Sequence, residues 1–156
     1  MFLEVFHLGD HMEVDFFVEN VKGDTVRKIF DENKQTIVEG NVLPGPIPFH
    51  YGFIIGTKNL DVTEENELNH SLDALLVGDI NAKNGDVVKA KVIGALMLEN
   101  KDHKIVLVPV DSKISHYVEL GENIIMTIVS WFTRFSPVEG WGGPEAGKRI
   151  VEESKK

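Results

Sequence analysis

Three prolines at alternate positions, Pro44, Pro46 and Pro48, constrain the path of this chain more than any other feature. Proline fixes the backbone angle φ, lacks an amide donor and disfavours helical geometry in the residue before it. The segment that contains them is therefore expected to be extended and non-helical. It leads directly into residues 49–52, so it delivers the tyrosine and the glycine of that run to a defined place in the fold.

Most of the chain consists of short runs rich in β-branched and aromatic residues. Apolar and polar residues alternate within several of these runs, and a period of two is typical of half-buried strands. Turn signals containing glycine separate the runs at residues 9–10, 22–24 and 84–86. The turn at 22–24 predicts that residues 12–31 form one hairpin. The predicted strands span residues 2–8, 12–21, 25–31, 35–42, 53–56, 72–78, 87–98 and 104–110.

Helical periodicity is confined to the last third of the chain. Apolar residues recur at helical spacing from residue 121 to 135, and Pro137 ends that pattern. Pro144 suits the first turn of a second helix, which is expected over residues 145–154. Many short strands followed by two helices predict a mainly β fold, a small closed barrel with two C-terminal helices packed on its outside. The length of 156 residues is that of a single domain spanning 1–156.

The charge balance limits the kinds of partner. There are 25 acidic and 16 basic residues, and the net charge of −9 repels polyphosphate backbones, so nucleic-acid binding is not expected. Because the chain has no cysteine, disulfides and thiolate metal sites are excluded. The N-terminal residues lack the pattern of a signal peptide, and no stretch approaches about 18 uninterrupted apolar residues. We therefore expect a cytoplasmic protein that does not bind membranes.

Several carboxylates stand at the ends of predicted strands. Asp73 precedes one buried strand, and Asp102 lies in the turn before another. Asp79 and Asp86 flank a further turn. Carboxylates at neighbouring strand ends can share a hard cation such as Mg²⁺, which prefers oxygen ligands. The alternative, which the spacing alone favours, is that each aspartate only stabilises its own turn.

Basic residues accompany these carboxylates. Lys104 follows shortly after Asp102, and Arg27 and Lys28 lie within a predicted strand. If these cationic side chains point into the mouth of a barrel, they would hold phosphate oxygens. On the outer face of a strand they would simply be solvated, and the sequence alone favours that alternative. The chain has no H-E-x-x-H pattern, glycine-rich phosphate loop or G-x-S-x-G elbow.

Five ordered segments resemble the family I soluble inorganic pyrophosphatases. The run Pro48–Ile54 resembles the family segment YPxNYGYI, and Ser71–Val77 resembles the second half of its signature DGDPLDVLV. The order and approximate spacing of the five segments hold across about residues 12–153. The other three are residues 85–96, similar to PGxVIxxRPIGVL, residues 102–110, similar to DxKVIAVPV, and residues 138–141 with 146–150, similar to VEGWxxAexAKxEI.

The resemblance implies a five-stranded OB-like barrel with flanking helices, hydrolysis of pyrophosphate with several Mg²⁺ ions, and a homo-oligomer. It also implies which side chains form the site. The metal ligands would be Asp73, Asp102 and Asn100, the phosphate-binding residues Arg27 or Lys28 with Tyr51 and Lys104, and the catalytic residues His70, Lys104 and Tyr51.

Six positions depart from the family pattern: Glu39 falls near an arginine of the family, Phe135 and Ser136 replace its late tyrosine–lysine pair, and the other three belong to its acidic motifs. Leu68 and His70 stand where the family has the first two aspartates of its signature, and Asn100 replaces the first aspartate of the next acidic pair. Leu68 ligates nothing, and Asn100 coordinates a metal without adding charge. An unperturbed histidine has a pKa of about 6.5, so His70 suits a base in place of the aspartate that activates water in the family. It can instead bind a softer metal ion.

The resemblance implies a metal-dependent inorganic pyrophosphatase that uses Mg²⁺ or another divalent ion. The departures predict that its activity is weakened or altered, because pyrophosphate hydrolysis relies on clustered carboxylates that hold several ions. The alternative is an inactive paralogue that binds a phosphate or nucleotide, or acts as an oligomeric structural or regulatory protein. An OB-type nucleic-acid binder is a third hypothesis, which the charge disfavours. Helix 121–135 carries more apolar residues than one narrow face needs, so part of it is expected to meet a neighbouring subunit.

Overall fold

The computed structural model describes residues 11–59 and 68–156. The strand expected over residues 2–8 lies outside the described residues. The elements in chain order are β1 (Glu13–Asn20), β2 (Val26–Asp31), β3 (Thr36–Val42), β4 (His50–Ile54), β5 (Asp73–Leu76), β6 (Val87–Leu98), β7 (Lys104–Pro109), the 3₁₀ helix η1 (Tyr117–Leu120), α2 (Glu122–Thr133), β8 (Val138–Gly142) and α3 (Pro144–Ser154).

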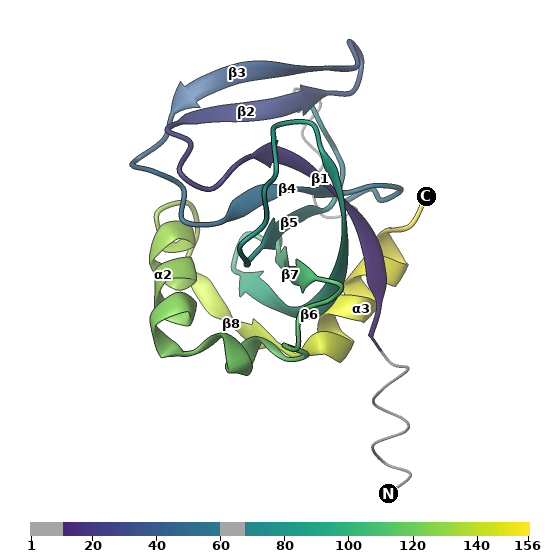
Figure 1. The fold of residues 1–156 in the computed structure, drawn as a ribbon, viewed down its shortest axis with the longest axis vertical. Coiled ribbons are helices and arrows are strands. Elements are labelled where there is room, and N and C mark those ends of the chain that lie inside the picture. The colour runs from purple at the N-terminus through teal and green to yellow at the C-terminus, as the bar shows by residue number, and fades with distance from the viewer. Residues whose placement is uncertain (1–10, 60–67) are drawn as a thin grey trace, which may run out of the picture.

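Five strands close into a barrel, which confirms the predicted fold class (Figure 1). Their order is β1-β4-β5-β7-β6, and β6 returns to pair with β1. All these pairings are antiparallel except the parallel pairing of β5 with β7. Closure leaves these five strands without an unpaired edge, which removes the usual risk of edge-to-edge association.

The predicted hairpin over residues 12–31 is wrong. β2 pairs with β3 in a separate two-stranded sheet, which lies beside the barrel in Figure 1. The reason is that β1 has β4 on one edge and β6 on the other, so it offers no edge to β2. The turn is present nonetheless: Gly23 adopts a positive φ of 97°, and the side chain of Asn20 donates to the carbonyl of Val26 at 2.9 Å.

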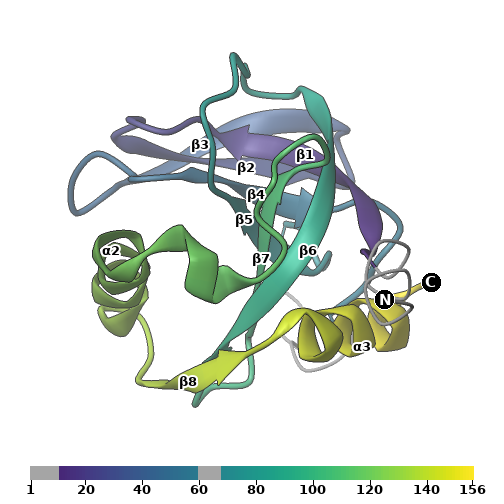
Figure 2. The same ribbon diagram turned by 60° about the horizontal axis from the view of Figure 1, so that its bottom comes forward.

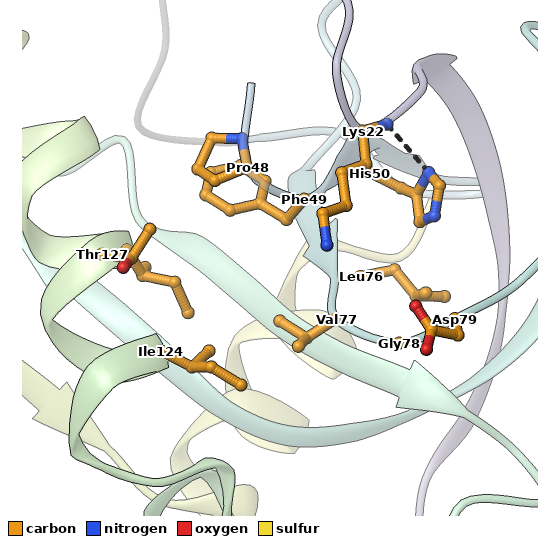
Figure 3. A pocket seen from close by; sticks show the side chains of 11 residues that line it. Lys22, Pro48, Phe49, His50, Leu76, Val77, Gly78, Asp79, Ile124 and Thr127 are labelled. Carbon is orange, nitrogen blue, oxygen red and sulfur yellow. Dashed lines mark hydrogen bonds between the residues drawn. The ribbon is translucent and has the colours of Figure 1, made fainter. Parts of the chain in front are cut away.

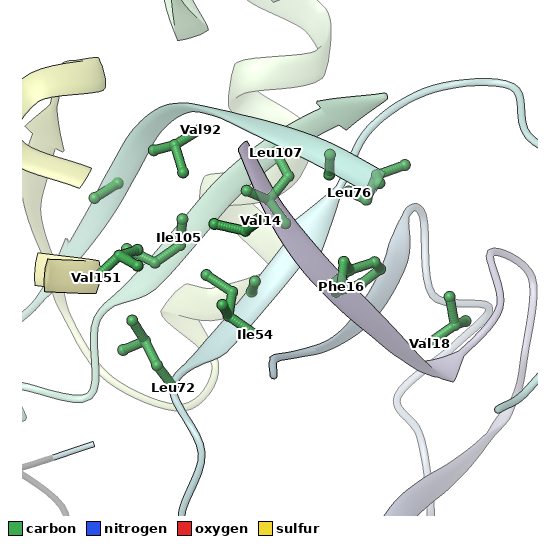
Figure 4. Close-up of a cluster of buried hydrophobic side chains, with 13 residues drawn as sticks. Val14, Phe16, Val18, Ile54, Leu72, Leu76, Val92, Ile105, Leu107 and Val151 are labelled. Atoms are coloured by element: carbon green, nitrogen blue, oxygen red, sulfur yellow. The ribbon is translucent and has the colours of Figure 1, made fainter. Parts of the chain in front are cut away.

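The barrel interior is filled by the apolar residues that alternate along its strands. In β1, Val14, Phe16 and Val18 point inward and are almost fully buried. They meet Ile54 of β4 and Leu107 of β7 in one cluster, which Figure 4 shows between the strands. Burying a side chain of this size contributes roughly 1.5–3 kcal/mol, so the alternation of the sequence stabilises this barrel directly.

The two C-terminal helices pack on different parts of the barrel (Figure 2). α2 buries Ile128, Trp131 and Phe132 in a second apolar cluster, where the ring of Phe49 stacks on that of Phe132 with centroids 5.5 Å apart. The proline segment thus ends by placing an aromatic residue under α2. α3 begins at Pro144 as predicted. Within the described residues, no helix is long and apolar enough to cross a membrane.

β8 is a strand that the sequence analysis does not predict. It joins the outer part of β6 beyond the barrel, with Leu96 opposite Trp141 and Leu98 opposite Val138. Its two glycines at 140 and 142 dilute the β pattern, and Gly140 has a φ of 155°. This strand is therefore formed by pairing with β6 rather than by its own propensity.

Candidate active site

A cavity of about 190 Å³ lies between the barrel and α2. It gathers polar side chains from β1, β2, β4, β5 and β7 and from the β6–β7 turn, and apolar ones from the proline segment and from α2. Six of the predicted site residues line it. The described residues that line it are Asn20, Arg27, Leu43, Ile47, Tyr51, Asp73, Leu98, Asn100, Asp102, Lys104, Trp131, Phe132 and Phe135.

Lys104 occupies the centre of the polar part. Its Nζ donates to Asp73 Oδ2 at 2.7 Å and to Asp102 Oδ2 at 2.9 Å. The parallel pairing of β5 with β7 brings these residues together, since Asp73 begins one strand and Lys104 the other. The lysine side chain is only 8% exposed, so both ion pairs are shielded from solvent on the lysine side.

The charges of this group depend on one another. Burial opposes the charge of Lys104, but the carboxylates of Asp73 and Asp102 outweigh it and hold the pKa of the amine well above its ordinary value. Burial raises the pKa of Asp102, which Lys104 partly opposes. The second carboxylate oxygen of Asp102 accepts a hydrogen bond from Asn59 Nδ2 at 3.0 Å. The ammonium group is therefore permanently charged, and it holds the two aspartates together.

Tyr51 forms the wall beside this group. It is buried between Phe49 and Phe132, and Lys104 Nζ lies 5.8 Å from the centre of its ring. Burial raises the pKa of Tyr51, and the nearby charge of Asp73 raises it further. The phenol consequently stays neutral and is able to donate a hydrogen bond to an anion in the cavity.

Of the two neighbouring cations in β2, only Arg27 lines the cavity among the described residues. Alternation along the strand turns the two side chains to opposite faces. The Nζ of Lys28 lies 3.7 Å from Asp24 Oδ2, and the backbone amide of Lys28 donates to Asn20 Oδ1 at 3.1 Å. Arg27 is thus the residue of this pair that faces the ligand space.

Asn100 and His70 are placed differently. Asn100 lines the cavity, but its Oδ1 accepts the backbone amide of Asp102 at 3.0 Å, a typical turn arrangement. His70 is not among the residues that line this cavity in the described part of the chain. Its backbone amide donates to Glu32 Oε1 at 2.8 Å, and the carbonyl of Leu68 accepts the backbone amide of Glu32 at 3.0 Å. Residues 68–70 are thereby tied to the β2–β3 turn.

The donor set fits one hard cation better than several. Among residues 11–59 and 68–156, no group of three or more carboxylate or histidine side chains converges as a metal site. Asp73 and Asp102 are the carboxylates of the cavity, and each already bonds Lys104. A Mg²⁺ ion keeps several waters and takes only one or two carboxylates when phosphate supplies further oxygens, so these two aspartates can hold it.

Glu19 is a residue near the site that the sequence analysis missed. It is only 2% exposed, and its Oε2 accepts the backbone amide of Phe30 at 2.7 Å. Burial raises the pKa of Glu19 to about 8, and the nearby charge of Asp73 adds to this, while Arg27 and Lys104 oppose it. The alternation of β1 gave a signal, because Glu19 shares a face with Phe17, whose ring stacks on that of Phe53.

Glu19 is expected to make the stability of the protein depend on pH. Because the folded pKa exceeds the unfolded one, the group stabilises the fold below the unfolded pKa, and this contribution is lost as pH rises through the folded pKa. Relative to Glu19→Gln, the wild type should lose about 1.4 kcal/mol per pH unit between about pH 5 and pH 8. Urea unfolding of both proteins across this range measures the difference. A difference that is constant with pH contradicts the assignment.

A second histidine, His50, lies at a different cavity (Figure 3). Its Nδ1 accepts the backbone amide of Lys22 at 3.1 Å. Burial, followed by the charge of Lys22, lowers the pKa of His50. The lining includes one carboxylate, that of Asp79, and otherwise mostly apolar side chains such as Ile124. The histidine is therefore a buried, neutral acceptor that fixes the β1–β2 turn.

Known proteins share the sequence pattern and the fold of this chain. The chain is 30% identical over 158 residues to an inorganic pyrophosphatase of Saccharolobus solfataricus, with 88% of each chain covered, and 28% identical to one of Nanoarchaeum equitans, covering 92% of this chain and 96% of the other. The crystal structure of the inorganic pyrophosphatase from Ehrlichia chaffeensis shares the fold with a TM-score of 0.80 at 24% identity, covering 91% and 92%. The model of the inorganic pyrophosphatase family matches residues 16–156. The chain therefore belongs to the inorganic pyrophosphatase family.

Proposed function

We propose that this protein hydrolyses inorganic pyrophosphate to phosphate with a divalent metal ion, Mg²⁺ in the first place, more slowly than a family member with the full set of aspartates. Family membership supports the reaction. The observation that carries the proposal is the convergence of Arg27, Tyr51, Asp73, Asp102 and Lys104 on one cavity.

The proposed role of each cavity residue follows from its charge. Arg27 and Lys104 bind phosphate oxygens, and the neutral phenol of Tyr51 donates a hydrogen bond to them. Asp73 and Asp102 would hold the metal ion, which would supply Lewis-acid polarisation of the phosphate and acidify bound water. The assignment of His70 as the base that activates water stays a prediction, since its side chain is not among those described as lining the cavity.

A reduced rate follows from the charges that the cavity holds. Two aspartates are balanced there by one arginine and one lysine. Leu68 and Asn100 bring no charge, although the resemblance places aspartates at both positions. Removing a single group that stabilises developing charge costs roughly 10²–10³ in rate, so a site with fewer carboxylates is expected to turn over slowly.

Phosphate release from pyrophosphate tests the proposal. We expect release that rises with protein concentration in Mg²⁺, Mn²⁺ or Co²⁺ and stops when a chelator is added. The folded state of the protein is confirmed by circular dichroism in the same buffers. Release no greater than the blank with all three ions contradicts the proposal.

One observation favours a second candidate, an inactive paralogue that binds phosphate or a nucleotide. Lys104 bonds both aspartates of the cavity and, together with Arg27, balances their charge, so an anion can bind without a metal ion. A ligand at 100 times its Kd stabilises the folded state by about 2.7 kcal/mol, which raises the melting temperature. Failure of pyrophosphate, nucleotides and metal ions to shift this temperature excludes the binding role.

For assembly and location, we propose a cytoplasmic homo-oligomer. α2 leaves Met126 59% exposed and Ile124 39% exposed on different sides of the helix, and Val118 in the preceding 3₁₀ helix is 59% exposed. Exposed apolar side chains of this size are available for a subunit contact. Light scattering at micromolar concentration should give a mass above that of one chain, and Met126→Lys should lower it. A monomeric mass for the wild type contradicts the proposal.

A further inference from the structure

The cavity that holds Lys104 has two unlike sides. One side carries the charged groups Arg27, Asp73, Asp102 and Lys104. The other side is apolar and comes from the proline segment, the end of β6, and α2 with the residues after it. Its members are Leu43, Ile47, Leu98, Trp131, Phe132 and Phe135. Inorganic pyrophosphate presents only charged oxygens, so it gives this apolar side nothing to contact.

Phe135 is the exposed part of the apolar side. Trp131 and Phe132 are only 8% and 3% exposed, whereas Phe135, just after the end of α2, is 58% exposed. Its backbone amide donates to the carbonyl of Phe132 at 2.9 Å, which holds it in the turn that closes the helix. Among the ring pairs of the described residues, none involves Phe135, while Phe132 lies against Phe49 and Tyr51. An exposed aromatic side chain that lines a cavity has a face available to a ligand.

The charged side fixes where an anionic group would sit. Arg27 and Lys104 are the cations among the described residues that line the cavity, and Lys104 Nζ lies 6.0 Å from the centre of the Phe132 ring. A phosphoryl group bonded to Lys104 therefore lies close to the aromatic side chains of α2. A substituent on that phosphoryl group would extend along the apolar side toward the rim, where Phe135 stands.

We propose that Phe135, together with Trp131 and Phe132, makes this site select phosphorylated ligands that carry an apolar or aromatic substituent, namely monoesters of phosphate or diphosphate. Arg27 and Lys104 bind the phosphoryl group, and the substituent packs against the apolar side. The inference rests on the proposed function only in placing phosphate in this cavity, and it requires no hydrolysis.

Binding of three compounds in the presence of Mg²⁺ tests the inference: inorganic phosphate, methyl phosphate and phenyl phosphate. Contact between two aromatic rings is favourable enough to strengthen binding by about 3- to 10-fold, so phenyl phosphate should bind more tightly than methyl phosphate by that factor. Phe135→Ser should bring this ratio close to one while leaving the affinity for inorganic phosphate unchanged. Arg27→Gln should weaken all three compounds by about the same factor.

Val87→Ser is the matched control, because Val87 is similarly exposed at 55% and does not line this cavity. It should keep the wild-type ratio. The inference is overturned if phenyl phosphate binds no more tightly than methyl phosphate, if Phe135→Ser keeps the ratio, or if none of the three compounds binds. Pyrophosphate hydrolysis is measured separately. If pyrophosphate is hydrolysed but phenyl and methyl phosphate bind equally well, only this inference fails. If phenyl phosphate binds more tightly but pyrophosphate is not hydrolysed, only the proposed hydrolysis fails.

Discussion

Replacing Lys104 by methionine is expected to lower kcat/KM for pyrophosphate by roughly 10²–10³, the effect of removing one group that stabilises developing charge. The amine lies between the carboxylates of Asp73 and Asp102, at 2.7 Å and 2.9 Å, and is nearly buried. Its loss removes a phosphate ligand and leaves two carboxylates facing each other without a cation. Phosphate release at several pyrophosphate concentrations, in Mg²⁺, measures the change.

The matched control for this variant is Lys89→Met. Lys89 also pairs with an aspartate, Asp15, at 2.8 Å, but it is 71% exposed and lies outside the cavity. Such exposed pairs contribute little to stability, so the control should keep wild-type activity and stability. Activity of Lys104→Met within about threefold of the wild type, in folded protein, shows that the amine does not act on the substrate.

Gly52→Ala is expected to have the largest effect on stability. A Cβ atom at this position would lie 1.8 Å from the carbonyl oxygen of Phe17 and 3.0 Å from the backbone nitrogen of Glu19. Both are backbone atoms of β1, so neither can move aside as a flexible side chain would. Gly52 is also paired with Val18 on one side and Ala74 on the other. The substitution must therefore separate β1 from β4 at the centre of the barrel.

We expect Gly52→Ala to lower the free energy of unfolding by more than about 4 kcal/mol, or to yield no folded protein, since effects of that size arise when the backbone itself must shift. Urea unfolding followed by circular dichroism measures this. Gly45→Ala is the control, because a Cβ there meets nothing within 4 Å. A Gly52→Ala protein within about 1 kcal/mol of the wild type would show that β1 and β4 are not packed in this way.

The fold was largely predictable because its signals are local. Runs of β-branched and apolar residues indicated most of the barrel strands, although β4 begins at His50 and not at residue 53. The prolines at 44, 46 and 48 correctly predicted a non-helical approach to β4. Pairing was less predictable, since it depends on which strand edges remain available. β1 takes β4 and β6 as partners from far along the chain, and this displaced β2 into a hairpin with β3.

Which side chains meet in the cavity could be predicted where the resemblance covered them, but not where burial decides. Tyr51, Asp73, Asp102 and Lys104 meet in one cavity, as expected from the family segments. The raised pKa of Glu19 could not be read from the sequence, because it follows from desolvation inside the fold. The apolar side of the cavity was hidden for a similar reason, since helical periodicity identifies apolar residues but not the cavity that they line.

The central claim is that this cavity hydrolyses pyrophosphate with a metal ion held by its aspartates. The most direct test compares phosphate release by the wild type and by Asp73→Asn in Mg²⁺, on protein purified in the same way. The proposal predicts turnover by the wild type and a loss of at least about 100-fold in the variant, since the amide removes the negative charge at the metal position. No turnover by the folded wild type, or equal turnover by both proteins, would contradict it.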